Sequence, residues 1–206
     1  MREIARKTKI DVNTAQHQLK KLETINVLSS TIKGKNKEYV LNLNNVITKY
    51  YLIMAETFAT IVYLHKNFII KKILVEIENK IDGPLILFGS FANSMYQPLR
   101  LNSVKICCLW WLITSRCLIH TANITYNKES DIDLFSIDGK KIEHNMILKT
   151  ASLIGRNINI KSTTESKFSS SLKNNDPLIN EVVSNHIVLK GVDKFCDIMW
   201  RYYETK

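Results

Sequence analysis

Apolar residues recur at helical or strand spacing along most of this chain, and turn residues separate the stretches. Helical spacing predicts helices over 2–8, 13–25, 45–81, 142–154, 177–187 and 192–203. Runs typical of strands fall at 27–32, 38–43, 85–88, 131–135 and 157–160, and a polar, serine-rich connection is expected over 162–171. Helices and strands in this mixed order predict an α/β protein of the α+β kind.

The region 45–81 is expected to be helical throughout. Its first part carries an apolar stripe that is typical of a core or of a homodimer seam: Ile47, Tyr51, Met54, Phe58, Ile61 and Val62. Its second part, 67–80, carries apolar residues that we expect to pack on a sheet, and Gly83-Pro84 then ends the helix.

Two separated motifs carry the clearest chemistry. The apolar run 85–88 ends in Gly89-Ser90, which predicts a buried strand, a tight turn and a helix whose free N–H groups can receive phosphate. Asp131 and Asp133 lie two apart in a strand pattern, so both carboxylates leave one face, roughly 7 Å apart along the strand, while Ile132 faces the core. Paired carboxylates beside a phosphate site suit Mg²⁺.

These motifs resemble those of polymerase-β-type nucleotidyltransferases, and the minimal members of that superfamily fit best. The resemblance implies a nucleotidyltransferase fold that transfers a nucleoside monophosphate, AMP from ATP, to an acceptor hydroxyl. It assigns phosphate binding to Gly89 and Ser90, and it makes Asp131 and Asp133 the catalytic ligands of Mg²⁺. The family places a third carboxylate where this chain has Asn159, whose amide supplies neither charge nor a base.

The spacing between the two motifs departs from the family. About ten residues normally separate them, whereas 91–130 intervene here. Joining Tyr96 to Asn127 would restore the ordinary spacing, so 97–126 is interpreted as an insertion; a native elaboration of the loop is the alternative. The insertion holds Cys107, Cys108 and Cys117 and two of the three tryptophans.

The amino-terminal pattern of helix, turn, helix and basic hairpin resembles a winged helix-turn-helix domain. That family has a further helix before the one expected at 2–8, whereas almost nothing precedes it here. Such a domain reads DNA with the start of its second helix and holds phosphates with its wing. The residues that this resemblance assigns to DNA are Asn13, Gln16, Gln18, Lys20, Lys33, Lys35 and Lys37. A solvated hairpin or a protein contact is the alternative.

Charge and composition support this picture. The chain carries a formal charge of +10, and residues 1–50 hold ten Lys/Arg against four Asp/Glu, a surplus of six. Such a surplus favours a polyanionic partner such as DNA. Four cysteines without a secretory signal predict a cytoplasmic protein, and no apolar run is long enough to span a membrane.

The sequence therefore predicts three units: a winged helix over 1–45, a helical linker over 46–82, and a nucleotidyltransferase domain over 83–206. The resemblance further implies a partner protein of the HEPN toxin class, because some family members adenylylate such partners. The alternative function is a DNA-binding regulator whose transferase domain is degenerate and not catalytic, which Asn159 and the insertion favour.

Overall fold

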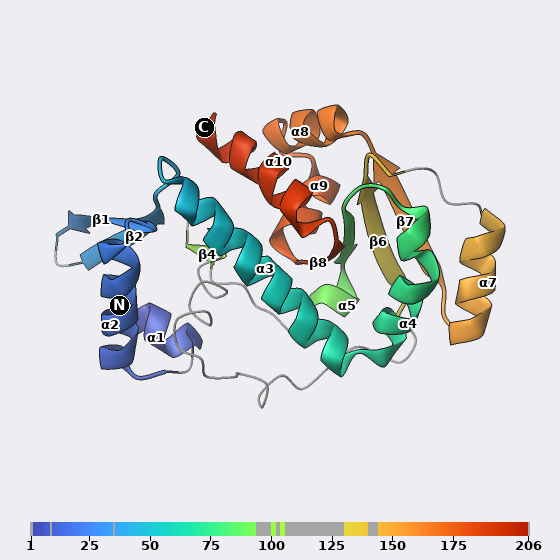
Figure 1. The fold of residues 1–206 in the computed structure, drawn as a ribbon, viewed down its shortest axis with the longest axis horizontal. Helices are drawn as coiled ribbons and strands as arrows, with labels where there is room; N and C mark the ends of the chain where they lie inside the picture. The colour runs from blue at the N-terminus through green and yellow to red at the C-terminus, as the bar shows by residue number, and fades with distance from the viewer. Residues whose placement is uncertain are drawn as a thin grey trace.

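The computed structural model describes residues 2–8, 10–34, 36–93, 100–101, 104–105, 130–139 and 144–205. The described chain is a mixed α/β structure in which a small amino-terminal unit and a helix-covered sheet are linked by a long helix (Figure 1). Among the described residues, no helix is long and apolar enough to cross a membrane.

The amino-terminal unit consists of two helices and a hairpin: α1 (Arg2–Thr8), α2 (Val12–Thr24), β1 (Leu28–Lys33) and β2 (Asn36–Leu41). The Asp11 carboxylate caps α2 by accepting a hydrogen bond from the Thr14 N–H at 2.8 Å, as expected for an N-cap aspartate. The two strands pair antiparallel, with Leu28 opposite Leu41. The helices and the hairpin together bury a small core of Ile4, Ala5, Ala15, Leu19, Leu22, Val27, Leu28 and Tyr39.

The larger unit is built on a four-stranded sheet. Its strands are β3 (Leu85–Phe88), β6 (Ile132–Ile137), β7 (Ile158–Thr163) and β8 (His186–Lys190), in the order β7-β6-β3-β8. Only β6 and β7 run parallel; β3 is antiparallel to both β6 and β8. A parallel pair needs a crossover, and helix α7 (His144–Ile154) lies in the connection between β6 and β7.

Helices cover both faces of this sheet, so the central strands are buried on both sides. One face packs on α3 (Val46–Lys66), α4 (Phe68–Ile77), the short α5 (Ser90–Asn93) and α7; the other packs on α8 (Glu165–Lys173), α9 (Pro177–Ser184) and α10 (Val192–Glu204). The alternation of strand side chains explains both cores: Leu85 and Leu87 face the first set of helices, whereas Ile86 and Phe88 face the second.

The expectation of one continuous helix over 45–81 was wrong. The helix breaks at Asn67, whose side chain donates to the Tyr63 carbonyl at 2.9 Å, and a single 3₁₀ turn (Glu78–Lys80) follows α4. The predicted apolar stripe is only partly packed within the chain: Tyr51 packs against the amino-terminal core, whereas Ile47, Met54 and Ile61 are about half exposed. A homodimer seam along this stripe stays a prediction. The buried face of α3 is instead small and polar: Thr48, Ala55, Glu56, Ala59, Thr60 and Tyr63.

This face packs closely because its hydroxyls bond to the sheet. Thr60 Oγ1 donates to the Val188 carbonyl of β8 at 2.6 Å, and Tyr63 Oη donates to the Phe91 carbonyl of α5 at 3.0 Å. Small residues allow the backbone of α3 to approach β8, and the hydroxyls donate to carbonyls of the packed elements. Helix α3 therefore belongs to the packing of the sheet.

The structure corrects two further expectations in the carboxyl-terminal region. The serine-rich segment 162–171 contains the end of β7 and most of α8, whose N-cap is Thr164. The helix that begins after Asp176 ends at Ser184, and the next residues form the buried strand β8. The sequence 186–190 is apolar but short, so the hydrophobic pattern alone did not separate this strand from a helix end.

Candidate functional site

The Gly89 turn joins a buried strand to a short helix. Strand β3 is fully buried, Gly89 follows with φ of +72°, and α5 begins at the exposed Ser90. Only glycine adopts such a φ without cost. A Cβ at Gly89 would also lie 3.0 Å from Asp133 Oδ2, so the turn and the Asp133 carboxylate are immediate neighbours.

The acidic pair approaches this turn from the adjacent strand. Asp133 lies opposite Phe88 in the β3–β6 register, and Asp131 immediately precedes β6. Ile132 is 0% exposed and packs in the core, whereas Asp131 is exposed and Asp133 is half-buried. The expected alternation is therefore present, with the intervening apolar side chain directed inward.

Asn159 joins the two carboxylates. It lies beside Asp133 in the parallel β6–β7 register, and its Nδ2 donates to Asp133 Oδ1 at 3.2 Å. The same nitrogen lies 3.5 Å from Asp131 Oδ2, at the limit of a hydrogen bond. A third carboxylate in this position would repel the pair, whereas the amide donates to it without adding charge.

Arg156 is a cation beside this site that the sequence pattern did not identify. Its Nη1 donates to the Ser130 carbonyl at 3.3 Å, and its guanidinium lies 5.3 Å from the centre of the Phe91 ring. Arg156 therefore contacts the residue before Asp131 and the residue after Ser90. The only signal in the sequence is its position three residues before Asn159.

The donor set of the site is suited to Mg²⁺, which prefers carboxylates together with phosphate oxygens and water. Asp131 and Asp133 present two carboxylates on one side of the sheet, and Asn159 faces them with its amide nitrogen rather than its oxygen. Among the described residues, no group of three or more His, Cys, Asp or Glu gathers into a closed metal cage. A metal here would therefore depend on ligands from a bound phosphate.

Most of the insertion predicted at 97–126 lies outside the described residues. Within it the structure describes two short strands, β4 (Arg100–Leu101) and β5 (Val104–Lys105), which pair with each other. The predicted cysteine cluster and Trp110-Trp111 also lie outside the described residues.

Most of the predicted DNA-binding side chains that the structure describes are on the surface. Asn13, Gln16 and Lys20 are exposed on α2, and Lys33 and Lys37 are exposed on the hairpin, while Lys35 lies outside the described residues. Gln18 was assigned wrongly. It is only 8% exposed because it points into the core side of α2, so it cannot reach a base edge.

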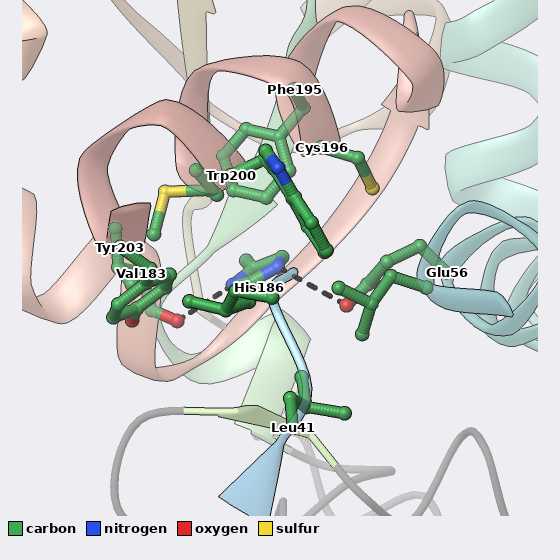
Figure 2. A pocket seen from close by; sticks show the side chains of 11 residues that line it. Leu41, Glu56, Val183, His186, Phe195, Cys196, Trp200 and Tyr203 are labelled. Atoms are coloured by element: carbon green, nitrogen blue, oxygen red, sulfur yellow. Dashed lines mark hydrogen bonds and ion pairs between the residues drawn. The ribbon is translucent and has the colours of Figure 1, made fainter. Parts of the chain in front are cut away.

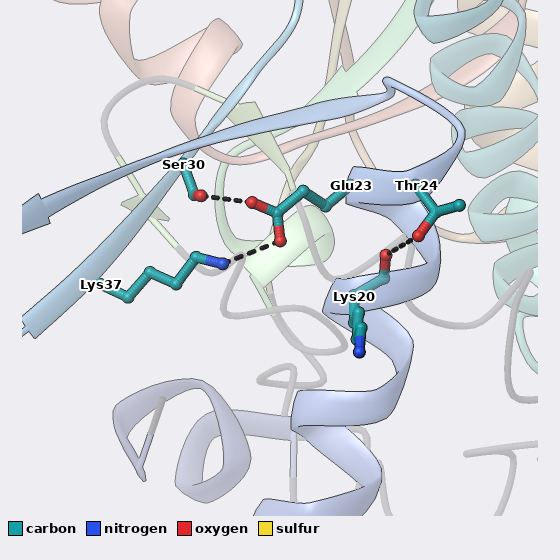
Figure 3. Close-up of polar contacts among 5 residues, drawn as sticks. All are labelled: Lys20, Glu23, Thr24, Ser30 and Lys37. Atoms are coloured by element: carbon teal, nitrogen blue, oxygen red, sulfur yellow. Dashed lines mark hydrogen bonds and ion pairs between the residues drawn. The ribbon is translucent and has the colours of Figure 1, made fainter.

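Ion pairs hold both described hairpin lysines. Lys37 Nζ lies 2.8 Å from Glu23 Oε2, and Lys33 Nζ lies 2.7 Å from Glu38 Oε2. Figure 3 shows the Glu23 side chain reaching from α2 toward the hairpin, where it also accepts a hydrogen bond from Ser30. The hydrogen bond from Lys37 is the main cause that lowers the pKa of Glu23, and the hydrogen bond to Glu23 raises the pKa of Lys37.

Two cations of the carboxyl-terminal region have partners away from the acidic pair. Lys190 donates to the carbonyls of Glu78 and Ile81, the latter at 2.6 Å, and Arg201 pairs with Glu165 at 2.7 Å. Lys190 thus satisfies the end of the 3₁₀ turn, and Arg201 links α10 to α8. Neither contacts the acidic pair.

No family model matches the chain, and neither a curated protein nor a solved structure matches it significantly. The functional interpretation therefore depends on the geometry of the site and on the resemblance of its motifs.

Proposed function

We propose that this protein is a nucleotidyltransferase of the polymerase-β type that carries an amino-terminal winged helix-turn-helix and binds DNA. One observation supports the transferase assignment most directly. Residues from three strands meet at one edge of the sheet: the Gly89 turn, the acidic pair and Asn159, with Asp133 in register between Phe88 and Asn159. This convergence is what the motif resemblance requires, and it supports the proposal.

In this proposal, Gly89 and Ser90 bind the β- and γ-phosphates of ATP, and Asp131 and Asp133 hold Mg²⁺. When bound, Mg²⁺ supplies charge stabilisation at the phosphates. The acceptor hydroxyl oxygen attacks the α-phosphorus, the bond from that phosphorus to the bridging oxygen breaks, and pyrophosphate leaves with the electron pair. The Asn159 amide cannot accept the hydroxyl proton, which passes to solvent.

Asn159 also supports a second candidate, a DNA-binding regulator that binds nucleotide without transferring it. With an amide at this position, the site has two carboxylates to hold Mg²⁺ and ATP. It has no third carboxylate to accept the proton of the acceptor hydroxyl, so turnover would be slow. The two candidates differ in a single measurable step, the release of pyrophosphate.

The test is transfer of label from α-labelled ATP in the presence of Mg²⁺, with candidate acceptor proteins of the HEPN class and with the chain alone. The proposal expects labelled acceptor and released pyrophosphate from wild type, and neither from Asp131→Asn. Binding of ATP without release of pyrophosphate under any of these conditions would favour the regulator. Absence of both binding and transfer would exclude the transferase and a nucleotide-binding regulator, and would leave a DNA-binding regulator with a degenerate domain.

DNA binding is supported by the exposed face of α2 and by the surplus of positive charge in residues 1–50. In this proposal, the exposed side chains of Asn13 and Gln16 contact base edges, and that of Lys20 contacts phosphate. A fluorescence titration of labelled duplex DNA at several salt concentrations tests this part separately. A flat dependence on salt would refute it, because phosphate contacts release counterions.

A further inference from the structure

Arg156 connects the two halves of the candidate site through its side chain. It follows Gly155, which ends α7 with φ of +69°, and it lies two residues before β7. The Arg156 N–H donates to the Ala151 carbonyl at 3.2 Å, so the end of α7 fixes the backbone from which this side chain begins. The side chain is half-buried and reaches both motifs.

The first contact of Arg156 concerns Asp131. This residue precedes β6 and lies outside the registered pairs that β6 makes with β3 and β7. The chain around it is attached to the turn after α7. The Ile132 N–H donates to the Asn157 carbonyl at 3.0 Å, and the Ser130 carbonyl accepts from Arg156 Nη1 at 3.3 Å. The backbone on each side of Asp131 is therefore held by this turn.

The second contact of Arg156 concerns the helix that begins at the Gly89 turn. The guanidinium carbon lies 5.3 Å from the centre of the Phe91 ring, within the range of a cation–π contact. Phe91 is the second residue of α5 and is 1% exposed. Helix α5 has four residues, too few for a helix to be stable by its own hydrogen bonds. Its position therefore depends on contacts such as this one.

Helix α3 fixes the backbone of the same phenylalanine. The inward face of α3 contacts successive elements along its length. Glu56 points toward His186 of β8, with Oε1 of the former 3.8 Å from Nε2 of the latter (Figure 2). About two turns further along, Tyr63 Oη donates to the Phe91 carbonyl at 3.0 Å. Thus α3 holds the carbonyl of Phe91, and Arg156 contacts its ring.

We propose that Arg156 is a positioning residue, which holds Asp131 and the Gly89 turn at the separation that Mg²⁺–ATP requires. The inference rests on the proposed function, because it concerns the same site. A guanidinium suits both contacts, since it is planar and can donate in its plane while one face lies against an aromatic ring. A lysine ammonium has the same charge without this plane.

Amide hydrogen exchange of the full chain, without any ligand, tests the positioning directly. We expect Arg156→Gln to raise the exchange rate of the Ile132 amide and of the α5 amides at least tenfold. The amide of Leu134, which lies inside the β6 ladders, should exchange as in wild type. Unchanged exchange at Ile132 and in α5 would overturn the proposal.

Calorimetric titration of Mg²⁺–ATP measures the consequence for the site. Arg156→Gln and Arg156→Lys should both lower the affinity more than tenfold. The control Arg201→Gln, which removes an arginine paired with Glu165 on the carboxyl-terminal helices, should stay within twofold of wild type. A loss of stability alone does not lower this affinity while a variant remains folded. Wild-type affinity in Arg156→Lys would show that charge alone matters and would overturn the proposal.

The two measurements separate failure of this inference from failure of the proposed function. Absence of Mg²⁺–ATP binding in wild type would refute the nucleotide site, and the exchange rates would still decide whether Arg156 fixes Asp131 and α5. Binding in wild type that both Arg156 variants retain within twofold would refute the positioning role alone. If Arg156→Gln fails to fold, Arg156→Lys keeps the charge and serves for both measurements.

Discussion

Gly89→Ala is the substitution whose effect the structure determines most closely. The backbone at Gly89 has φ of +72°, and an alanine there costs about 1–2 kcal/mol in the left-handed region. Its Cβ would also lie 3.0 Å from Asp133 Oδ2, so the carboxylate must move by a few tenths of an ångström. That movement disturbs Asp133, whose other oxygen accepts the hydrogen bond from Asn159 at 3.2 Å.

Gly34→Ala is the matched control. Gly34 has φ of +60°, but an added Cβ there meets no atom within 4 Å. Both variants should therefore lower the free energy of unfolding by about 1–2 kcal/mol, because both place alanine in the same backbone region. Only Gly89→Ala should weaken Mg²⁺-dependent ATP binding, by more than tenfold, which corresponds to about 1.4 kcal/mol.

Urea unfolding measures the first quantity and calorimetric titration of Mg²⁺–ATP measures the second. An affinity of Gly89→Ala within twofold of the Gly34→Ala control would refute the reasoning, since the contact with Asp133 would then have no consequence for the ligand. A loss of stability in Gly89→Ala much larger than in Gly34→Ala would show that Asp133 cannot move aside.

Three further substitutions test other parts of the structure. Asn159→Asp should destabilise the protein by about 1–2 kcal/mol without Mg²⁺, because three carboxylates then converge, and Mg²⁺ should restore the loss in thermal unfolding. Glu23→Gln should lower the urea midpoint more at pH 7 than at pH 3. The pKa of Glu23 is lowered on folding, chiefly by its hydrogen bond with Lys37, so its contribution is present above the ordinary value of 4.5 and is lost as pH falls through the lowered value. Lys20→Ala should reduce the salt slope of DNA binding by about one, while Lys71→Ala on α4 should not.

The sequence predicted the parts of the site that depend on short local patterns. A buried strand that ends in Gly89, and an apolar residue between Asp131 and Asp133, are each defined within a few residues, and the structure has both. Asn159 lies beside Asp133 because β6 and β7 pair in parallel. The motif resemblance implied this neighbour, but the local hydrophobic pattern does not show which strands pair.

The sequence failed where packing between distant elements decides the outcome. Helix α3 buries Ala55, Ala59 and Thr60 because β8 lies against them, although larger apolar residues elsewhere on the helix gave the stronger pattern. Gln18 is buried by the same kind of tertiary contact, and its Oε1 finds no hydrogen-bond partner among the described residues. Burial of small or polar residues leaves little signal in hydrophobic periodicity.

The central claim is that the acidic pair beside the Gly89 turn binds a nucleotide through Mg²⁺. Calorimetric titration of ATP, with and without Mg²⁺, into wild type and into the double variant Asp131→Asn with Asp133→Asn tests it directly. Asp193→Asn, an exposed position in the first turn of α10, is the control. The account predicts Mg²⁺-dependent binding in wild type and in the control and its loss in the double variant; equal binding in all three, or no binding in wild type, would contradict it.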